Sequence, residues 1–202
     1  MRHHRPAPVD PQRMDIPSSG SDPAEVTETA HRTAEVLVGA GRASDDPELT
    51  RRLVGLVREL GLSTVAEMWA DRPARSLPGA LWRLYLLHEW VQRQPVEVGR
   101  AFTAGSRHAE VYRVIAGVSE PPGPEDLRTM TDQILTGVFD GDLADALERA
   151  AAFCHVMAVG LAGPDADPDE IQQEQVHRAS RLQATAEDLL AGARLWRRDD
   201  LA

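Results

Sequence analysis

The stretch 22-DPAEVTETAHRTAEVLVGAG-41 contains the pattern that decides the fold class. Asp22 is a favourable N-cap residue, Pro23 suits the first helical position and Glu25 falls at N3, which together mark a helix start. Apolar residues then recur at helical spacing, and two glycines mark the end. That apolar face consists of Val26, Ala30, Ala34, Leu37 and Val38. The stretch predicts one amphipathic α-helix.

The same punctuation recurs along the chain. Asp46-Pro47-Glu48 and Asp167-Pro168-Asp169-Glu170 repeat the first helix start, and Gly61 is placed as a helix stop. The remaining expected starts are Ser63, Pro78, Pro95, Ser106, Glu125 and Asp142. No segment shows the sustained alternation of a β-strand. We therefore expect an all-α fold, a single irregular bundle of about eight or nine helices. Its last two long helices pack antiparallel and form much of the core with a Trp-rich helix.

The domain organisation follows from the same pattern. Residues 1–21 are rich in Pro, Ser, Arg and Asp without periodicity, which predicts a disordered N-terminal tail. Residues 22–202 are expected to form one all-helical domain, and residues 120–124 are its best candidate for a linker.

Charge and composition exclude several classes of protein. Apolar residues make up 42% of the chain and the net charge is −10, without the long apolar run of a membrane helix. All 22 basic residues are Arg, and no basic stripe is present, which disfavours nucleic-acid binding. The charge is uneven, because residues 121–202 hold sixteen acids and seven Arg. Cys154, the single cysteine, lies on an apolar helix stripe and is expected in the core. No apolar leader follows residues 1–5, so we expect a cytoplasmic protein.

The most informative stretch for function is residues 69–93, which contains three of the four Trp. Its central helix is apolar nearly all round, so it is either central in the core or half-buried with an interaction face. In the second case, aromatic residues supply apolar area and Arg residues bind a carboxylate or phosphate. The candidate binding residues are Trp69, Arg72, Arg75, Trp82, Arg83, Tyr85, His88 and Glu89.

Two other interpretations of the sequence are less favoured. The spacings Glu28…His31 and Glu174…His177 resemble those of di-iron helical bundles, but these side chains lie off the apolar stripes. We expect no metal site and no cofactor. Residues 57–69 with the following helix resemble the entry of a TetR-like regulator. The would-be recognition helix is dominated by Leu and Trp, whereas base and phosphate contacts need polar groups.

These observations leave three functions. The leading one is a non-enzymatic helical protein-interaction or regulatory module with a Trp/Arg-rich working surface at residues 69–93, whose partner is an unknown protein or a second copy of the chain. An alternative is a helical domain that binds a small anionic molecule, which requires an enclosed cavity at the same place. The third is a TetR-like transcriptional regulator. An enzyme is left open but disfavoured, because the sequence has no P-loop, dinucleotide fingerprint, nucleophile elbow or paired-Cys zinc spacing.

Four stretches of the chain resemble a family of small, all-helical actinobacterial proteins. They are residues 46–85, which include 75-RSLPGALWRLY-85, and residues 116–124, 146–154 and 193–197. The resemblance covers most of the chain after residue 22 and implies a helical fold and a source, without assigning a catalytic residue. Some members of that family carry the label RNA polymerase β subunit. A helical chain of 202 residues is far too small for that large mixed α/β subunit.

Overall fold

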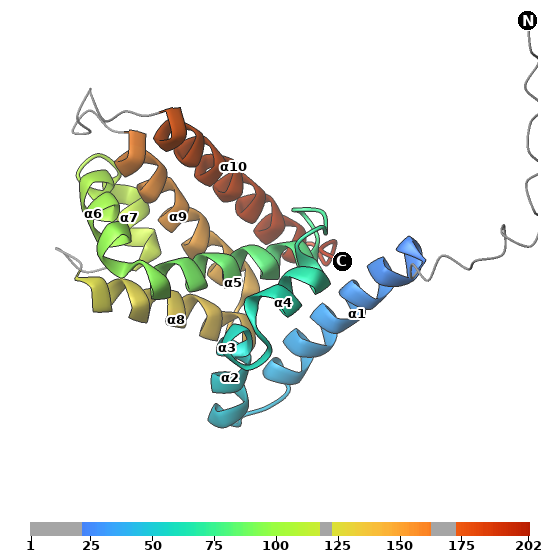
Figure 1. The fold of residues 1–202 in the computed structure, drawn as a ribbon. Helices are drawn as coiled ribbons and strands as arrows, with labels where there is room; N and C mark the ends of the chain where they lie inside the picture. Colours follow the sequence, from blue (N-terminus) through green and yellow to red (C-terminus); the bar gives the residue numbers. More distant parts are fainter. Residues whose placement is uncertain (1–21, 118–122, 163–172) are drawn as a thin grey trace, which may run out of the picture.

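The structure, a computed structural model, describes residues 22–117, 123–162 and 173–202. These residues form ten α-helices and no strand, which confirms the predicted all-α bundle (Figure 1). The helices are α1 (Pro23–Arg42), α2 (Pro47–Val54), α3 (Leu56–Leu60), α4 (Leu62–Trp69), α5 (Leu77–Arg93), α6 (Pro95–Ser106), α7 (Glu110–Ala116), α8 (Pro124–Asp140), α9 (Leu143–Ala162) and α10 (Gln173–Trp196). The count is higher than expected because the helix predicted after Asp46 is divided at Gly55 into α2 and α3.

The N-caps explain where several helices begin. The carboxylates of Asp22 and Asp46 accept hydrogen bonds from the backbone N–H groups two residues on, at 3.0 and 2.9 Å. Ser76 caps α5, which therefore begins one residue before the predicted Pro78. These bonds satisfy backbone donors that no helix can satisfy internally.

Two predicted caps are wrong. Ser63 lies inside the first turn of α4, which begins at Leu62 after Gly61, a glycine with φ of 86°. Ser106 is the last residue of α6, and its hydroxyl donates back to the carbonyl of Thr103 at 2.9 Å and does not cap α7, which begins at Glu110. The expected start at Asp167 and the tail 1–21 lie outside the described residues, as does most of the expected linker.

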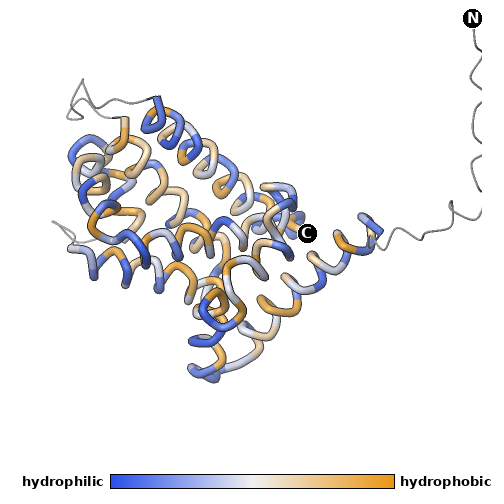
Figure 2. The backbone as a smooth tube through the Cα atoms, in the orientation of Figure 1, coloured by the Kyte–Doolittle hydropathy of each residue, from blue (hydrophilic) through white to orange (hydrophobic). Residues whose placement is uncertain are grey.

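Helix α9 lies at the centre of the bundle and packs against α6, α7, α8 and α10. Helix α10 runs back along it in the opposite direction, as predicted (Figure 1). The guanidinium of Arg197, just after α10, binds Glu148 and Asp145 near the start of α9, and its hydrogen bond lowers the pKa of Glu148. Figure 2 shows α9 as largely apolar, whereas α10 alternates between polar and apolar residues. This difference matches a central helix beside a half-exposed one.

Helix α5 crosses the bundle and contacts α1, α4, α8 and α10. Its buried residues include Leu81, Leu84, Tyr85 and Val91. The start of α5 lies beside the chain's last residue, because the backbone N–H of Leu77 donates to the carbonyl of Ala202 at 2.8 Å. Within the described residues, no helix combines the length and the apolar run that a membrane crossing requires.

The thiol of Cys154 is expected to be unreactive in the folded protein. Cys154 is fully buried in α9, and burial raises its pKa from 9.0 to about 12. Ellman's reagent is therefore expected to label it only as fast as the protein opens, and fully in guanidinium chloride. Because the unfolded thiol ionises first, the same shift lowers stability above about pH 9 and leaves it unchanged below. Rapid stoichiometric labelling of the native protein would contradict this placement.

Candidate functional site

Two of the predicted binding residues are core residues. Trp69 and Tyr85 have no exposed surface, and their rings stack with centroids 6.1 Å apart. The indole of Trp69 donates to the hydroxyl of Thr33 at 3.3 Å, and the hydroxyl of Tyr85 donates to the carbonyl of Leu53 at 2.5 Å. Burial raises the pKa of Tyr85 well above its usual value. Their expected place in a working surface is therefore corrected: both tie α4 and α5 to α1 and α2.

The three predicted arginines do not lie together. Arg72 reaches α1, where it donates to the hydroxyl of Thr27 at 2.6 Å. Arg75 and Arg83 both approach Asp188 of α10, with the nearest nitrogen–oxygen distances at 3.3 and 3.8 Å. Arg83 also donates to the carbonyl of Gly79 at 2.9 Å. Arg75 and Arg83 therefore lie together, and Arg72 lies apart from them.

His88 and Glu89 belong to neither group. Nε2 of His88 lies 2.7 Å from a carboxylate oxygen of Asp132 on α8, so it carries the proton that Asp132 accepts. Its Nδ1 is buried and has no hydrogen-bond partner among the described residues. Glu89 pairs with Arg93 at 2.5 Å on the same helix. His88 thus joins α5 to α8, on a side of α5 that does not face α10.

Trp82 is half-buried and packs against the core. The eight predicted residues therefore do not form one surface. The structure gathers instead a different set around Arg83, on the side of α5 that faces α10.

An open groove of about 430 Å³ lies between α5 and α10. We call it the α5–α10 groove, and define it by its lining. The lining residues are Arg83, Leu86, Leu87 and Trp90 from α5, and Arg178, Arg181, Leu182 and Thr185 from α10. The first four fall within the predicted stretch 69–93. The other four were missed, although their spacing of three, four and seven residues from Arg178 places them on one helix face.

The groove is lined by apolar side chains and by arginines. Leu86 is 43% exposed, and Leu87, Trp90 and Leu182 are half-buried beside it. Among the described residues that line the groove, none is acidic and three are arginines. An exposed Leu next to Arg side chains is a feature of contact surfaces.

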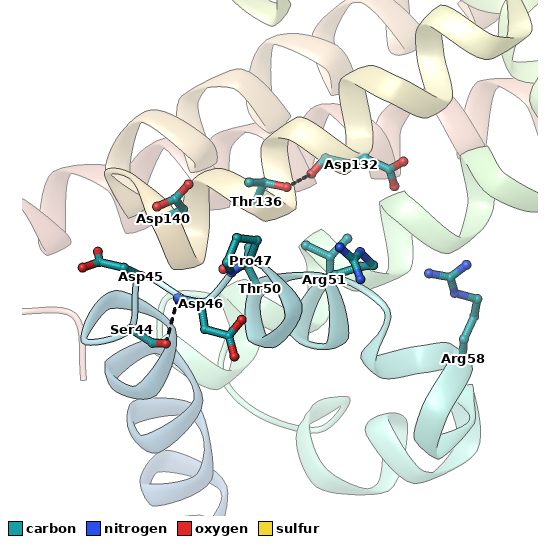
Figure 3. A pocket seen from close by; sticks show the side chains of 11 residues that line it. Ser44, Asp45, Asp46, Pro47, Thr50, Arg51, Arg58, Asp132, Thr136 and Asp140 are labelled. Atoms are coloured by element: carbon teal, nitrogen blue, oxygen red, sulfur yellow. Dashed lines mark hydrogen bonds between the residues drawn. The ribbon is translucent and has the colours of Figure 1, made fainter.

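A second hollow, of about 380 Å³, lies between the α1–α2 turn and α8 (Figure 3). Its charged side chains include Asp45, Asp140 and Arg58, and all three are exposed. The figure shows the two carboxylates at one end and Arg58 at the other. Among the described residues, its lining, unlike that of the α5–α10 groove, contains no Leu or Trp side chain, so the hollow offers less apolar surface for a partner to bury.

Within the described part of the chain, no three His, Cys, Asp or Glu side chains gather in a way that could hold a metal ion. Glu28 of the first di-iron-like spacing pairs with Arg32 on the surface of α1. Comparison of the chain with family models, with curated proteins and with solved structures gives no match. The α5–α10 groove is therefore the candidate functional site.

Proposed function

We propose that this chain is a non-enzymatic interaction module that binds a partner protein in the α5–α10 groove. The observation that carries the proposal is the exposed Leu86, which lies in an apolar hollow next to Trp90 and Leu182. Burying such a side chain under a partner contributes about 1–2 kcal/mol. Aromatic and Arg residues at the centre of a hollow are the residue types that dominate binding energy at protein interfaces.

The shape of the groove favours a protein partner over a small molecule. A small ligand needs a site that buries about 70–90% of its surface, and the α5–α10 groove is open to solvent. Its lining offers no carboxylate, thiol or imidazole, and its one hydroxyl, on Thr185, donates to the carbonyl of Arg181 at 2.9 Å. These groups suit contact between surfaces more than bond-making chemistry.

The regulator alternative has less support. It requires the helix that begins near Pro78 to enter a DNA groove. That helix, α5, is packed between α1, α4 and α8, and its buried face includes Leu81, Leu84 and Val91. Insertion into DNA would expose those side chains to water.

The test compares two single substitutions that place a carboxylate on an exposed apolar residue. Leu86→Glu is expected to lower recovery of the co-purifying partner from native cells at least about tenfold, because a charge would be buried at the contact. Val111→Glu, on α7, is the matched control, because Val111 is 70% exposed and lies away from the groove.

Both variants are expected to keep their melting temperatures within about 2 °C, since neither side chain is in the core. Sedimentation equilibrium of the wild type and Leu86→Glu shows whether the partner is a second copy of the chain. A partner that Leu86→Glu recovers as well as the wild type does, or that Val111→Glu loses, would contradict the proposal.

A further inference from the structure

We infer that the α5–α10 groove recognises a short acidic–apolar segment of its partner, which places a carboxylate on Arg181 and an apolar side chain against Leu86. This inference rests on the proposed function and adds the chemistry of the occupant. It follows from the charge of the groove, from its length and from the charge of residues 121–202.

Arg181 provides the free positive charge in the groove. Arg178 is already engaged, because it donates to Glu97 at 3.1 Å and lies over the ring of Trp90 at 6.0 Å. Arg83 donates to the carbonyl of Gly79 and approaches Asp188. The guanidinium of Arg181 has no hydrogen bond or ion pair with any residue that the structure describes. Its planar fork of N–H groups matches a carboxylate.

The two ends of the groove limit the length of the occupant. At one end Arg83 extends from α5 towards Asp188 of α10, and at the other Arg178 extends from α10 over Trp90 of α5. From Arg83 to Trp90 the helix rises about 10 Å, and from Arg178 to Asp188 about 15 Å. An occupant that lies between these ends is about two helical turns, or three to five extended residues.

The charge of the C-terminal half of the sequence favours this place for an acidic partner. Residues 121–202 carry sixteen acids and only seven arginines, so that half of the chain has a net negative charge, which disfavours a carboxylate. Arg178 and Arg181 are two of those seven arginines, and both line the groove. An acidic segment would therefore be directed to the α5–α10 groove by repulsion elsewhere as well as by attraction there.

The apolar part of the occupant is specified by the apolar lining of the groove. Leu86, Trp90 and Leu182 present aliphatic and aromatic surface. A Leu, Ile or Phe side chain of the partner would pack against this surface while its neighbouring carboxylate reaches Arg181. The arrangement is that of an apolar anchor with a polar rim.

The test selects peptides from a random dodecapeptide display library on the full chain, with parallel selection on Arg181→Glu. The wild type is expected to enrich peptides that combine Asp or Glu with Leu, Ile, Phe or Trp, and Arg181→Glu is expected to enrich Lys or Arg in their place. Selection without an acidic preference, or with the same peptides from both proteins, would overturn the inference.

The best selected peptide is then measured by fluorescence anisotropy. Its Glu→Gln analogue, and the Arg181→Gln variant with the original peptide, are each expected to bind about tenfold more weakly. The control is Arg58→Gln, another exposed arginine, which lines the other hollow and is expected to leave affinity unchanged. Equal weakening by Arg58→Gln would show a general charge effect and overturn the inference.

Two further outcomes separate this inference from the proposed function. If Leu86→Glu loses the cellular partner while no acidic peptide is selected, the groove is a docking site and the inferred chemistry is wrong. If decanoate binds the wild type but not Arg181→Gln, and does not compete with the selected peptides, the peptides bind elsewhere. The occupant of the groove is then an anionic amphiphile, and the peptide assignment is wrong.

Discussion

Gly160→Ala is expected to lower the free energy of unfolding by about 3 kcal/mol or more, because α6 and α9 meet backbone to backbone at this glycine. A Cβ on Gly160 would lie 1.8 Å from the carbonyl oxygen of Ala101, and one on Gly105 would lie 1.9 Å from that of Val156. Neither obstacle is a side chain that can rotate away. The helices must separate, and they form one of the larger contacts of the bundle.

Urea denaturation followed by far-ultraviolet circular dichroism measures this effect, and Gly39→Ala is the matched control. Gly39 lies in α1 with no atom within 4 Å of a new Cβ, so alanine there is expected to stabilise the protein by about 0.5–1 kcal/mol. If Gly160→Ala lowers the free energy of unfolding while Gly39→Ala raises it, the loss at Gly160 is due to the α6–α9 contact and not to the change from Gly to Ala itself. If Gly160→Ala lowers the free energy of unfolding by less than about 1 kcal/mol, the close backbone contact between α6 and α9 is wrong.

Trp69→Ala is expected to cost about 4 kcal/mol of unfolding free energy, which is a large part of the stability of an ordinary domain. Trp69 is fully buried, stacks on Tyr85 and hydrogen-bonds to Thr33. Truncation would leave a cavity between α1, α4 and α5 together with a lost hydrogen bond. The same denaturation measurement gives the value.

Trp82→Ala is the comparison that separates core from surface among the predicted residues. Trp82 is half-buried, so its truncation is expected to cost about 2 kcal/mol, roughly half the cost at Trp69. If Trp82→Ala lowers the free energy of unfolding as much as Trp69→Ala does, or more, the assignment of Trp69 as buried and Trp82 as half-buried is wrong.

The fold class could be predicted because the interactions that begin a helix join residues close together in the sequence. The cap at Asp22 depends on one side chain and a backbone N–H two residues away, so sequence alone identifies it. The prediction failed at Ser106 because α6 continues to this residue and α7 begins only at Glu110, without a side-chain cap that the sequence could have shown. The break at Gly55 was missed because α2 and α3 share one apolar pattern.

Only the α5 half of the candidate site could be predicted from the sequence. Helix α5 is apolar nearly all round, so its sequence could not show which side faces α10 and which faces α8. Arg83 and His88 were grouped as neighbours in sequence, yet they point to Asp188 and Asp132 on different helices. The α10 half of the groove lies about ninety residues further along the chain. Only tertiary packing brings Arg181 opposite Leu86.

We propose that the α5–α10 groove is where this protein makes its specific contact. The most direct measurement follows the backbone amide and indole NMR resonances of the chain while the recovered partner or selected peptide is added. We predict the largest shifts at Leu86, the indole of Trp90, Arg181 and Leu182, with small changes elsewhere. Shifts concentrated on the exposed apolar side chains of α7, or around Asp45 and Asp140, with the groove unchanged, would contradict the account.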